Sequence, residues 1–290
     1  MNKSVRRYHE RRGLKTGASA DVIALGLIVL GLIPALSCQS PQQPEEGRKA
    51  AYAQVIRLGK WDEQSLNGVI RAASQIPDPG ERIGYISAHF LGTRYEPDTL
   101  VGGKDIKETL VVNLEGMDCF TYLDYVEAMR LSSSLGEFGG NIKTVRYRGG
   151  KVDYKSRKHF FTQWKSGSPE NIRDITRDVG SALTASKDLN LKEDGSLYLP
   201  AIPVKRQLVS YIPGAVIDDA VIAKLKTGDY IGVYTETEGL GVSHTGIFIR
   251  KDGKTYFRHA SSKTALMKVA DEDFKTYFAD KPGIVVFRAK

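Results

Sequence analysis

Hydrophobic residues recur at spacings of three and four near the start of the chain, a pattern typical of amphipathic helices. Between residues 49 and 76 the apolar positions are Ala53, Val55, Ile56, Leu58, Leu66, Val69, Ile70 and Ala73. The run Pro77-Asp78-Pro79-Gly80 ends this stretch, because proline lacks an amide hydrogen and glycine favours turns. A second helix is predicted from Glu81 to Leu91.

A third helix is predicted to begin at Cys119, with Asp118 as its N-cap. Apolar positions follow at helical spacing, namely Cys119, Tyr122, Leu123, Val126 and Met129. We therefore expect Cys119 to lie on the helix face that packs on the core. A thiol at a helix N-terminus faces unpaired amide groups and the positive end of the macrodipole, which predicts a lowered pKa.

The C-terminal part of the chain is rich in β-branched and aromatic residues, which favours strands. The predicted strands are 229–235, 243–250, 255–260 and 283–288. Together with the Cys119 helix they indicate an α+β fold, in which that helix packs on an antiparallel sheet.

A hairpin is predicted at Asp252-Gly253, because Asp-Gly is a strong signal for a two-residue turn. Its register places Lys251 opposite Lys254 and Gly246 opposite His259. His244 then shares a face with His259 as a diagonal neighbour, roughly 7 to 8 Å away at the backbone. We expect Gly246 to leave the space between the two rings open.

One cysteine and two paired histidines form a candidate hydrolytic site, with Cys119 as nucleophile, one histidine as base and the other as orienting group. Three alternatives remain open: a buried structural cysteine, histidines with only structural roles, and a zinc site. The zinc interpretation lacks further ligands at suitable spacing, since His9, His89 and His159 are scattered. No metal or other cofactor is predicted.

The chain resembles NlpC/p60-type, papain-like cysteine peptidases, and most of all the branch called N-acetylmuramoyl-L-alanine amidase-like (domain of unknown function 1460). The motifs that carry this resemblance are Leu91-Gly92-Thr93-Arg94-Tyr95, Gly116-Met117-Asp118-Cys119-Phe120-Thr121, Ser243-His244-Thr245-Gly246 and His259-Ala260-Ser261-Ser262. Segments similar to Tyr147–Trp164 and Tyr211-Ile212-Pro213 accompany them, and the likeness spans roughly residues 80 to 290. One departure is Arg94, where the related motif often has proline.

The resemblance implies a papain-like NlpC-type fold and hydrolysis of an amide bond in peptidoglycan. It implies Cys119 as nucleophile, His244 as base and His259 as third polar member. It also suggests the Tyr95 hydroxyl as an oxyanion donor beside the backbone N–H of Cys119, although a tyrosine that merely packs in a loop fits the sequence equally well.

The predicted substrate is a peptidoglycan fragment or muropeptide, cut at the N-acetylmuramoyl-L-alanine bond. Asp118, Arg157 and His159 are predicted to bind it. Two alternatives stay open: an endopeptidase that cuts after the D-glutamyl residue of the stem peptide, and a non-catalytic lipoprotein that binds muropeptides.

Residues 141–165 hold eight Lys or Arg and one Asp among several aromatic side chains. The cations are Lys143, Arg146, Arg148, Lys151, Lys155, Arg157, Lys158 and Lys165. A basic wall beside the cleft would attract anionic stem peptides. A solvated charged loop and a nucleic-acid surface are the alternatives; nucleic acid is not predicted as a partner, because the chain carries an export signal.

That signal is a basic N-terminus followed by an apolar run from Val22 to Leu36, too short for a spanning helix. We predict a signal peptide over 1–37, a lipidated Cys38 and a linker over 38–48, which places the protein on the periplasmic side of a bacterial membrane. Ala35-Leu36-Ser37 also fits ordinary cleavage and secretion, and Arg11-Arg12 is a weak twin-arginine signal. Removal of residues 1–37 lowers the formal net charge from +8 to +4, since they hold six Lys or Arg and two acids.

Residues 49–290 are predicted to form one cysteine amidase domain, with a helical N-terminal elaboration over 49–79 and a catalytic core over 80–290. No disulfide is expected, because one of the two cysteines lies in the processed region. We expect a monomer whose only membrane contact is the N-terminal lipid anchor.

Overall fold

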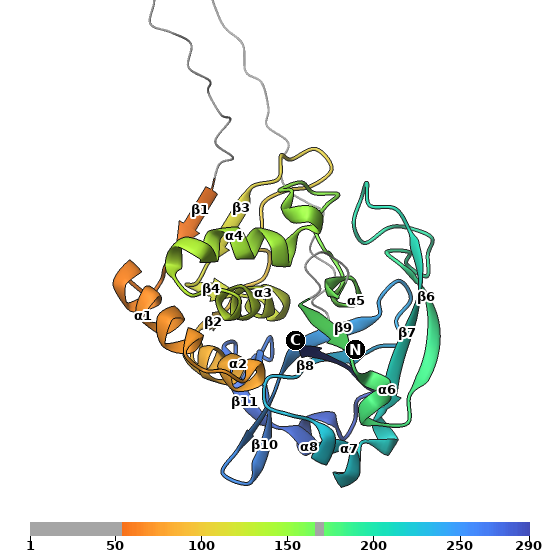
Figure 1. Cartoon of the computed structure of the whole chain (residues 1–290). Helices are drawn as coiled ribbons and strands as arrows, with labels where there is room; N and C mark the ends of the chain where they lie inside the picture. The colour runs from red at the N-terminus through yellow and green to blue at the C-terminus, as the bar shows by residue number, and fades with distance from the viewer. Residues whose placement is uncertain (1–53, 166–170) are drawn as a thin grey trace, which may run out of the picture. The chain divides into compact units, whose positions relative to one another are not determined.

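The computed structural model describes residues 54–165 and 171–290 (Figure 1). The predicted signal peptide, the lipidated Cys38 and the linker lie outside these residues. Within the described ranges, no helix is both long and apolar enough to cross a membrane.

Three of the helices, α1, α2 and α4, pack around a central helix, α3, which bears Cys119. The α-helices are α1 (Glu63–Ser74), α2 (Pro79–Ala88), α3 (Cys119–Arg130), α4 (Leu135–Arg146), α5 (Phe161–Trp164), α6 (Thr176–Val179), α7 (Asp219–Lys224) and α8 (Phe274–Phe278). Two short 3₁₀ helices are η2 (Arg148–Gly150) and η3 (Gly214–Val216). Because α1, α2, α4 and strand β9 (Val242–Lys251) all contact α3, the helix is buried on every side from Thr121 to Arg130. The predicted core-facing residues Tyr122, Leu123, Val126 and Met129 are buried as expected, whereas Cys119 itself is half-buried.

The N-terminal elaboration is only partly helical. The prediction of a helix through residues 49–76 was wrong at its start, where residues 54–57 form strand β1 (Gln54–Arg57). This strand pairs in parallel with β3 (Leu110–Asn113), and the pairing leaves Val55 and Ile56 exposed on its surface. The second helix is confirmed as α2, which begins at Pro79 because Asp78 caps it and proline suits a first helical turn.

An eight-stranded sheet forms the C-terminal part, in the order β11-β10-β9-β8-β12-β7-β6, with β5 also paired to β12. Its strands are β5 (Ile172–Asp174), β6 (Leu183–Leu189), β7 (Lys205–Pro213), β8 (Tyr230–Tyr234), β9, β10 (Lys254–Ala260), β11 (Val269–Asp273) and β12 (Gly283–Ala289). Every pair in this sheet is antiparallel. The α+β fold, with the Cys119 helix on an antiparallel sheet, is confirmed; a small parallel pair, β2 (Arg94–Tyr95) with β4 (Gly116–Met117), leads into α3.

Both faces of the sheet are covered by helices. Ile247 and Phe287 point into the core shared with α1 to α4, whereas Phe248 and Val286 point into the core shared with α6, α7 and α8. Alternate residues thus enter different cores. This explains why β8, β9 and β12 consist largely of apolar runs rather than alternating polar and apolar residues.

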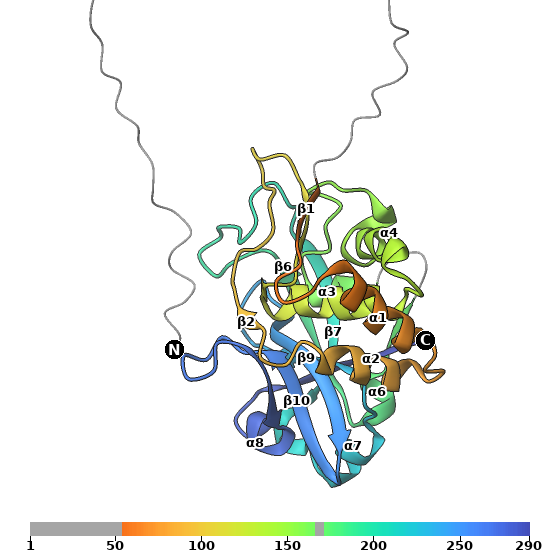
Figure 2. The ribbon, with the colours of Figure 1, turned by 90° about the vertical axis from the view of Figure 1, so that its left-hand side faces the viewer.

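The predicted hairpin register is confirmed for β9 and β10, which lie side by side in Figure 2. Lys251 pairs with Lys254, and the pairing continues to Ile247 with Arg258. The expected open space at Gly246 was wrong, because the Phe257 ring fills it. A Cβ added at Gly246 would lie 2.5 Å from that ring and 2.7 Å from the Arg258 carbonyl oxygen.

Replacement of Gly246 by alanine is expected to lower both stability and activity. The new methyl group must displace Phe257, whose ring stacks on His259 at 4.7 Å between centroids. Overpacking of this kind costs about 1–3 kcal/mol. Gly68→Ala is the control, because nothing lies within 4 Å of its Cβ and helix formation favours alanine by about 0.5–1 kcal/mol. Urea unfolding checks both variants; a Gly246→Ala protein as stable and active as the parent would contradict this account.

Candidate active site

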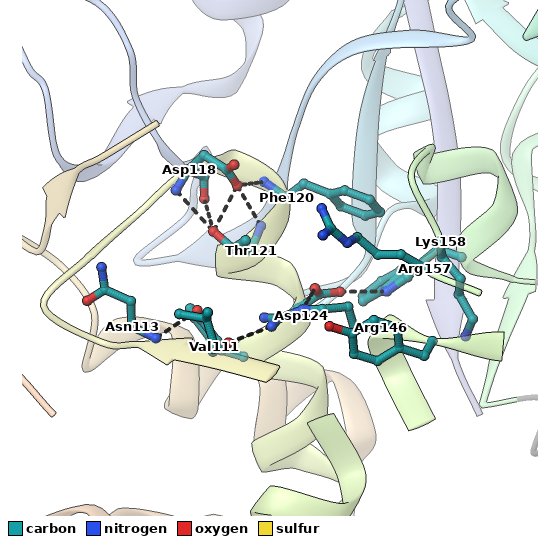
Figure 3. A network of polar contacts seen from close by, with 12 residues as sticks. Val111, Asn113, Asp118, Phe120, Thr121, Asp124, Arg146, Arg157 and Lys158 are labelled. Atoms are coloured by element: carbon teal, nitrogen blue, oxygen red, sulfur yellow. Dashed lines mark hydrogen bonds and ion pairs between the residues drawn. The ribbon is translucent and has the colours of Figure 1, made fainter. Parts of the chain in front are cut away.

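Cys119 is the first residue of α3, and its position is determined by the Asp118 cap (Figure 3). The Asp118 carboxylate accepts hydrogen bonds from the backbone N–H of Phe120 at 3.0 Å and of Thr121 at 2.7 Å. The Thr121 hydroxyl in turn accepts from the Asp118 N–H at 3.1 Å, which completes a capping box. Thr245 of β9 donates from its hydroxyl to the Cys119 carbonyl oxygen at 2.9 Å, so the helix start is tied to the sheet.

The thiol has a raised pKa, contrary to the expectation from its helix position. Burial, followed by the negative charge of Asp118, raises the pKa of Cys119 to about 12. Hydrogen bonds from Thr245 act in the opposite direction but are outweighed. The residue is therefore a protonated thiol at neutral pH, and it needs a base to become a nucleophile.

Alkylation of Cys119 should follow this raised pKa. Iodoacetamide reacts with the thiolate, so the rate of labelling is expected to rise about tenfold per pH unit from pH 7 to pH 10. Mass analysis of the peptide that contains Cys119 measures this rate, with Cys119→Ala as the unlabelled control. A rate that is already constant from about pH 5 upward would mean that a thiolate–imidazolium pair exists at rest, and the raised pKa would be wrong.

The two histidines form a hydrogen-bonded line with a carboxylate. His244 Nε2 lies 2.6 Å from His259 Nδ1, and His259 Nε2 lies 2.7 Å from Glu272 Oε1. The predicted pairing of the two rings across the hairpin is thereby confirmed. Lys263 donates to the other oxygen of Glu272 at 2.5 Å. The line thus runs from β9 through β10 to β11.

The carboxylate determines which nitrogens carry protons. Because ionised Glu272 only accepts, His259 Nε2 is the donor, so His259 Nδ1 accepts from His244 Nε2–H. This leaves His244 Nδ1 unprotonated, and it makes no hydrogen bond to any residue in the described part of the chain. Such a nitrogen is available as a general base.

The pKa shifts of this line favour the same protonation states. Burial, then the neighbouring charges of His259 and Lys263, lowers the pKa of His244 to about 3. Burial also lowers the pKa of His259, although Glu272 opposes this effect. Burial tends to raise the pKa of Glu272, but hydrogen bonds from Lys263 and His259 outweigh it and the pKa is lowered. At neutral pH both rings are neutral and Glu272 is ionised.

Glu272 was missed by the sequence analysis, because β11 was not predicted as a strand. We expect Glu272→Gln to lower kcat/KM about 10- to 100-fold, as when a histidine loses its outer hydrogen-bond partner. The glutamine can present its N–H₂ to His259, which would push the proton onto His244 Nδ1 and remove the base. Steady-state kinetics measures the loss, and the exposed Glu193→Gln is the control. Unchanged kcat/KM in Glu272→Gln would contradict the role of this carboxylate.

Tyr95 lies on β2, beside the strand β4 that leads into α3. Its backbone N–H donates to the Met267 carbonyl oxygen at 2.9 Å. Burial, and after it the negative charges of Cys119 and Asp118, raises the pKa of Tyr95. The phenol therefore keeps its proton at neutral pH and can act as a hydrogen-bond donor.

A cleft of about 240 Å³ contains both Cys119 and His244. Its wall is mostly apolar and aromatic, and comes from α3, α5, β9 and three loop segments; it includes Phe120, Phe160, Phe161, Tyr198, Leu199 and Leu240. His159 also lines it, and its Nε2 lies 2.7 Å from the Tyr154 carbonyl oxygen; a contact of His159 with substrate stays a prediction. Burial lowers the pKa of His159 to about 4. Since its described lining has no Lys, Arg, Asp or Glu, the cleft is uncharged at neutral pH.

The predicted basic wall is not in this cleft. None of the eight cations of residues 141–165 lines it, because most are engaged elsewhere. Arg146 pairs with buried Asp124 at 2.8 Å, and Lys165 pairs with Asp174 at 2.6 Å (Figure 3 shows the first). Arg157 forms a bidentate pair with Glu108, so the structure does not bring it to the cleft. The carboxylate of Asp118 caps α3, and a contact with substrate remains a prediction for both residues.

In the described ranges, no group of three or more His, Cys, Asp or Glu is arranged to hold a metal ion. The side chains of the site form hydrogen bonds with one another, from His244 through His259 to Glu272. This geometry suits proton transfer to and from a thiol.

Comparisons with known proteins find a matching family model and similar solved structures. A family model for N-acetylmuramoyl-L-alanine amidase-like (AmiA-like) proteins matches residues 85–284. A solved N-acetylmuramoyl-L-alanine amidase from Bacteroides uniformis is 27% identical with a TM-score of 0.62, over 73% of this chain and 99% of that chain. A structure described as a putative xylanase from Bacteroides fragilis is 29% identical with a TM-score of 0.57, over 70% of this chain and 99% of that chain.

A third structure, from Legionella pneumophila, has a TM-score of 0.66 at 22% identity, over 78% of this chain and 94% of that chain. At this identity the likeness shows the fold alone. No curated protein matches the chain.

Proposed function

This chain belongs to the N-acetylmuramoyl-L-alanine amidase-like family, and we propose that it is a cysteine hydrolase that cleaves the amide bond between N-acetylmuramic acid and L-alanine in peptidoglycan fragments. One observation carries the cysteine mechanism. The line from Glu272 through His259 to His244 leaves a single free nitrogen, on a ring that lines the same cleft as Cys119.

In the proposed reaction, His244 Nδ1 takes the thiol proton of Cys119 as the sulfur attacks the amide carbonyl carbon. The tetrahedral intermediate collapses when the imidazolium of His244 gives this proton to the leaving amine of L-alanine. A thioester between Cys119 and the lactyl group of the sugar remains. His244 then activates a water molecule, which releases the lactyl carboxylate and restores the thiol. Catalytic hydrogen bonds are often long before substrate binds, which is consistent with the absence of a bond between His244 and the thiol at rest.

The negative oxygen of the intermediate needs donors near the sulfur. We assign the backbone N–H of Cys119, at the start of α3, as the first donor. Tyr95 is the second, since its phenol is protonated at neutral pH and its pKa responds to the charge on Cys119.

The uncharged cleft favours the amidase over the endopeptidase. A cut after the D-glutamyl residue would place a free carboxylate of that residue close to the scissile bond. Transfer of such a charge into an uncharged, mostly apolar cleft is costly unless a partner pairs with it. The acetylated sugar and its lactyl group are neutral beside the N-acetylmuramoyl bond, and they suit the aromatic wall of Phe120 and Phe160.

We also place the fold in the papain-like NlpC/p60 superfamily. The features that support this placement are a cysteine at a helix N-terminus and two histidines on an adjacent antiparallel sheet. We propose in addition that the protein acts on the periplasmic side of a bacterial membrane through a lipid on Cys38. The basic and apolar N-terminal sequence supports this location.

Product identification tests the proposed bond. Purified protein and its Cys119→Ala variant are incubated with a muropeptide of N-acetylmuramic acid and a stem peptide, and the products are identified by mass. Release of an intact peptide that begins with L-alanine, absent in the variant, is the expected result. A cut within the stem would establish the endopeptidase instead, and no cleavage would favour a binding protein.

A further inference from the structure

A second hollow lies apart from the catalytic cleft and shares none of its lining residues. It has a volume of about 740 Å³ and is formed by three segments, at 57–60, 91–94 and 114–115. Three cations line it, Arg57, Lys60 and Arg94, against one carboxylate, Glu115. The lining of this hollow is thus charged, whereas that of the catalytic cleft is not.

Two of the three cations, Arg57 and Lys60, form no ion pair with a carboxylate of the described residues. Lys60 donates to the carbonyl oxygen of His89 at 2.7 Å, which is a neutral acceptor. Arg57 is exposed and forms no ion pair with any carboxylate in the described residues. Arg94 alone is shared with acids, at 2.9 Å from Glu96 and 3.5 Å from Glu115. The hollow therefore carries net positive charge and attracts anions.

The backbone holds these cations in place. Arg57 ends β1, where it pairs with Asn113, and its carbonyl oxygen accepts from the Leu114 N–H at 2.8 Å. Gly59 then turns with a φ of +63°, and a Cβ there would lie 2.7 Å from the Cα of Glu115. Only glycine fits this close approach, so the loop from Arg57 to Lys60 packs directly on the segment that precedes Cys119.

The hollow is within reach of the reacting bond. Arg94 pairs with Gly116 across the two short strands, and Gly116 is followed two residues later by Asp118 and then by Cys119. Three residues of extended chain span roughly 10 Å. A substrate stem peptide of three residues, with its scissile amide bond held at Cys119, spans a similar length and can reach Arg94. In Figure 1, β2 and β4 lie on the opposite side of α3 from α5, which lines the catalytic cleft.

We propose that this hollow binds the carboxylates of the substrate's stem peptide, while the uncharged cleft holds the sugar. The proposal rests on the proposed amidase function and assigns an orientation to its substrate. Charge alone decides the orientation, since the stem is anionic and the sugar next to the bond is neutral.

Equilibrium binding of the free stem peptide tests the proposal without reference to catalysis. The probes are the tripeptide L-alanyl-γ-D-glutamyl-diaminopimelate and the same peptide with its carboxylates amidated. Calorimetry compares the purified protein with the Arg57→Gln/Lys60→Gln double variant, which leaves Arg94 beside Tyr95 intact. Lys251→Gln/Lys254→Gln, at the exposed β9–β10 turn, is the control for loss of two positive charges.

We expect the double variant to bind the acidic tripeptide about tenfold more weakly than the parent protein, with the loss reduced at high salt. The amidated peptide should show no such difference. No binding of the acidic peptide by the parent protein, equal affinity of both proteins for it, or an equal loss for both peptides would overturn the proposal. Hydrolysis of a muropeptide by the parent protein is measured separately. Absence of hydrolysis would contradict the amidase function, whereas unchanged binding of the acidic peptide by the double variant would contradict only the proposed binding site.

Discussion

Replacement of Cys119 by alanine is expected to reduce muropeptide hydrolysis by about 10⁴-fold or more, because the reaction then loses its covalent intermediate. Cys119→Ser should be almost as inactive. A serine hydroxyl is a weaker nucleophile than a thiol, and the burial that raises the pKa of Cys119 to about 12 would disfavour an alkoxide even more. Rates of product release from a defined muropeptide check both variants.

Folding must be verified for these variants, because Cys119 starts a helix that is buried on every side. The Asp118 cap does not involve the thiol, so the Cys119→Ala protein should unfold at the same urea concentration as the parent. A folded Cys119→Ala variant that keeps substantial activity would rule out the thiol as nucleophile.

Loss of His244 is expected to have the second largest effect. The thiol is protonated at rest, so removal of its base in His244→Ala should lower kcat/KM about 10²- to 10⁴-fold. Added imidazole should restore part of the activity, because the ring leaves a gap beside the cleft. Steady-state rates with and without imidazole give the result, with His89→Gln, outside the cleft, as the control.

The pH dependence gives His244 a second readout. Because burial lowers its pKa to about 3, the ring is neutral from about pH 4 upward, and activity should not fall as the pH is lowered from 7 to 5. Activity is lost only when the ring takes up a proton as the pH approaches its pKa. A fall centred between pH 6 and 7 would mean that the base titrates as an ordinary histidine, against the buried line described here.

Much of this site could be predicted from local sequence. The turn at Asp252-Gly253 determines the register of β9 and β10, and that register alone brings His244 and His259 together. Likewise, Asp118 before Cys119 is a local capping signal that defines where α3 begins. Both predictions depend on residues only a few positions apart.

The predictions that were wrong concern features that depend on contacts between distant segments. Residues 54–57 pair with β3, more than fifty residues away, and this overrides their helical periodicity. Glu272 reaches His259 only because β11 adds to the edge of the sheet beside β10. The raised pKa of Cys119 comes from burial, which the helix position does not reveal. The cations of residues 141–165 were expected at the cleft, but none lines it, and Arg146, Arg157 and Lys165 pair with acids from other elements.

The proposed mechanism depends on one covalent step, the transfer of a muramoyl group to Cys119. Rapid acid quenching of the protein with a muropeptide, followed by mass analysis of the peptide that contains Cys119, tests it directly. We predict a transient increase equal to the mass of the muramoyl acyl group, together with free stem peptide that begins with L-alanine. An adduct that instead carries L-alanyl-D-glutamate, or hydrolysis that proceeds with no adduct on Cys119, would contradict the account.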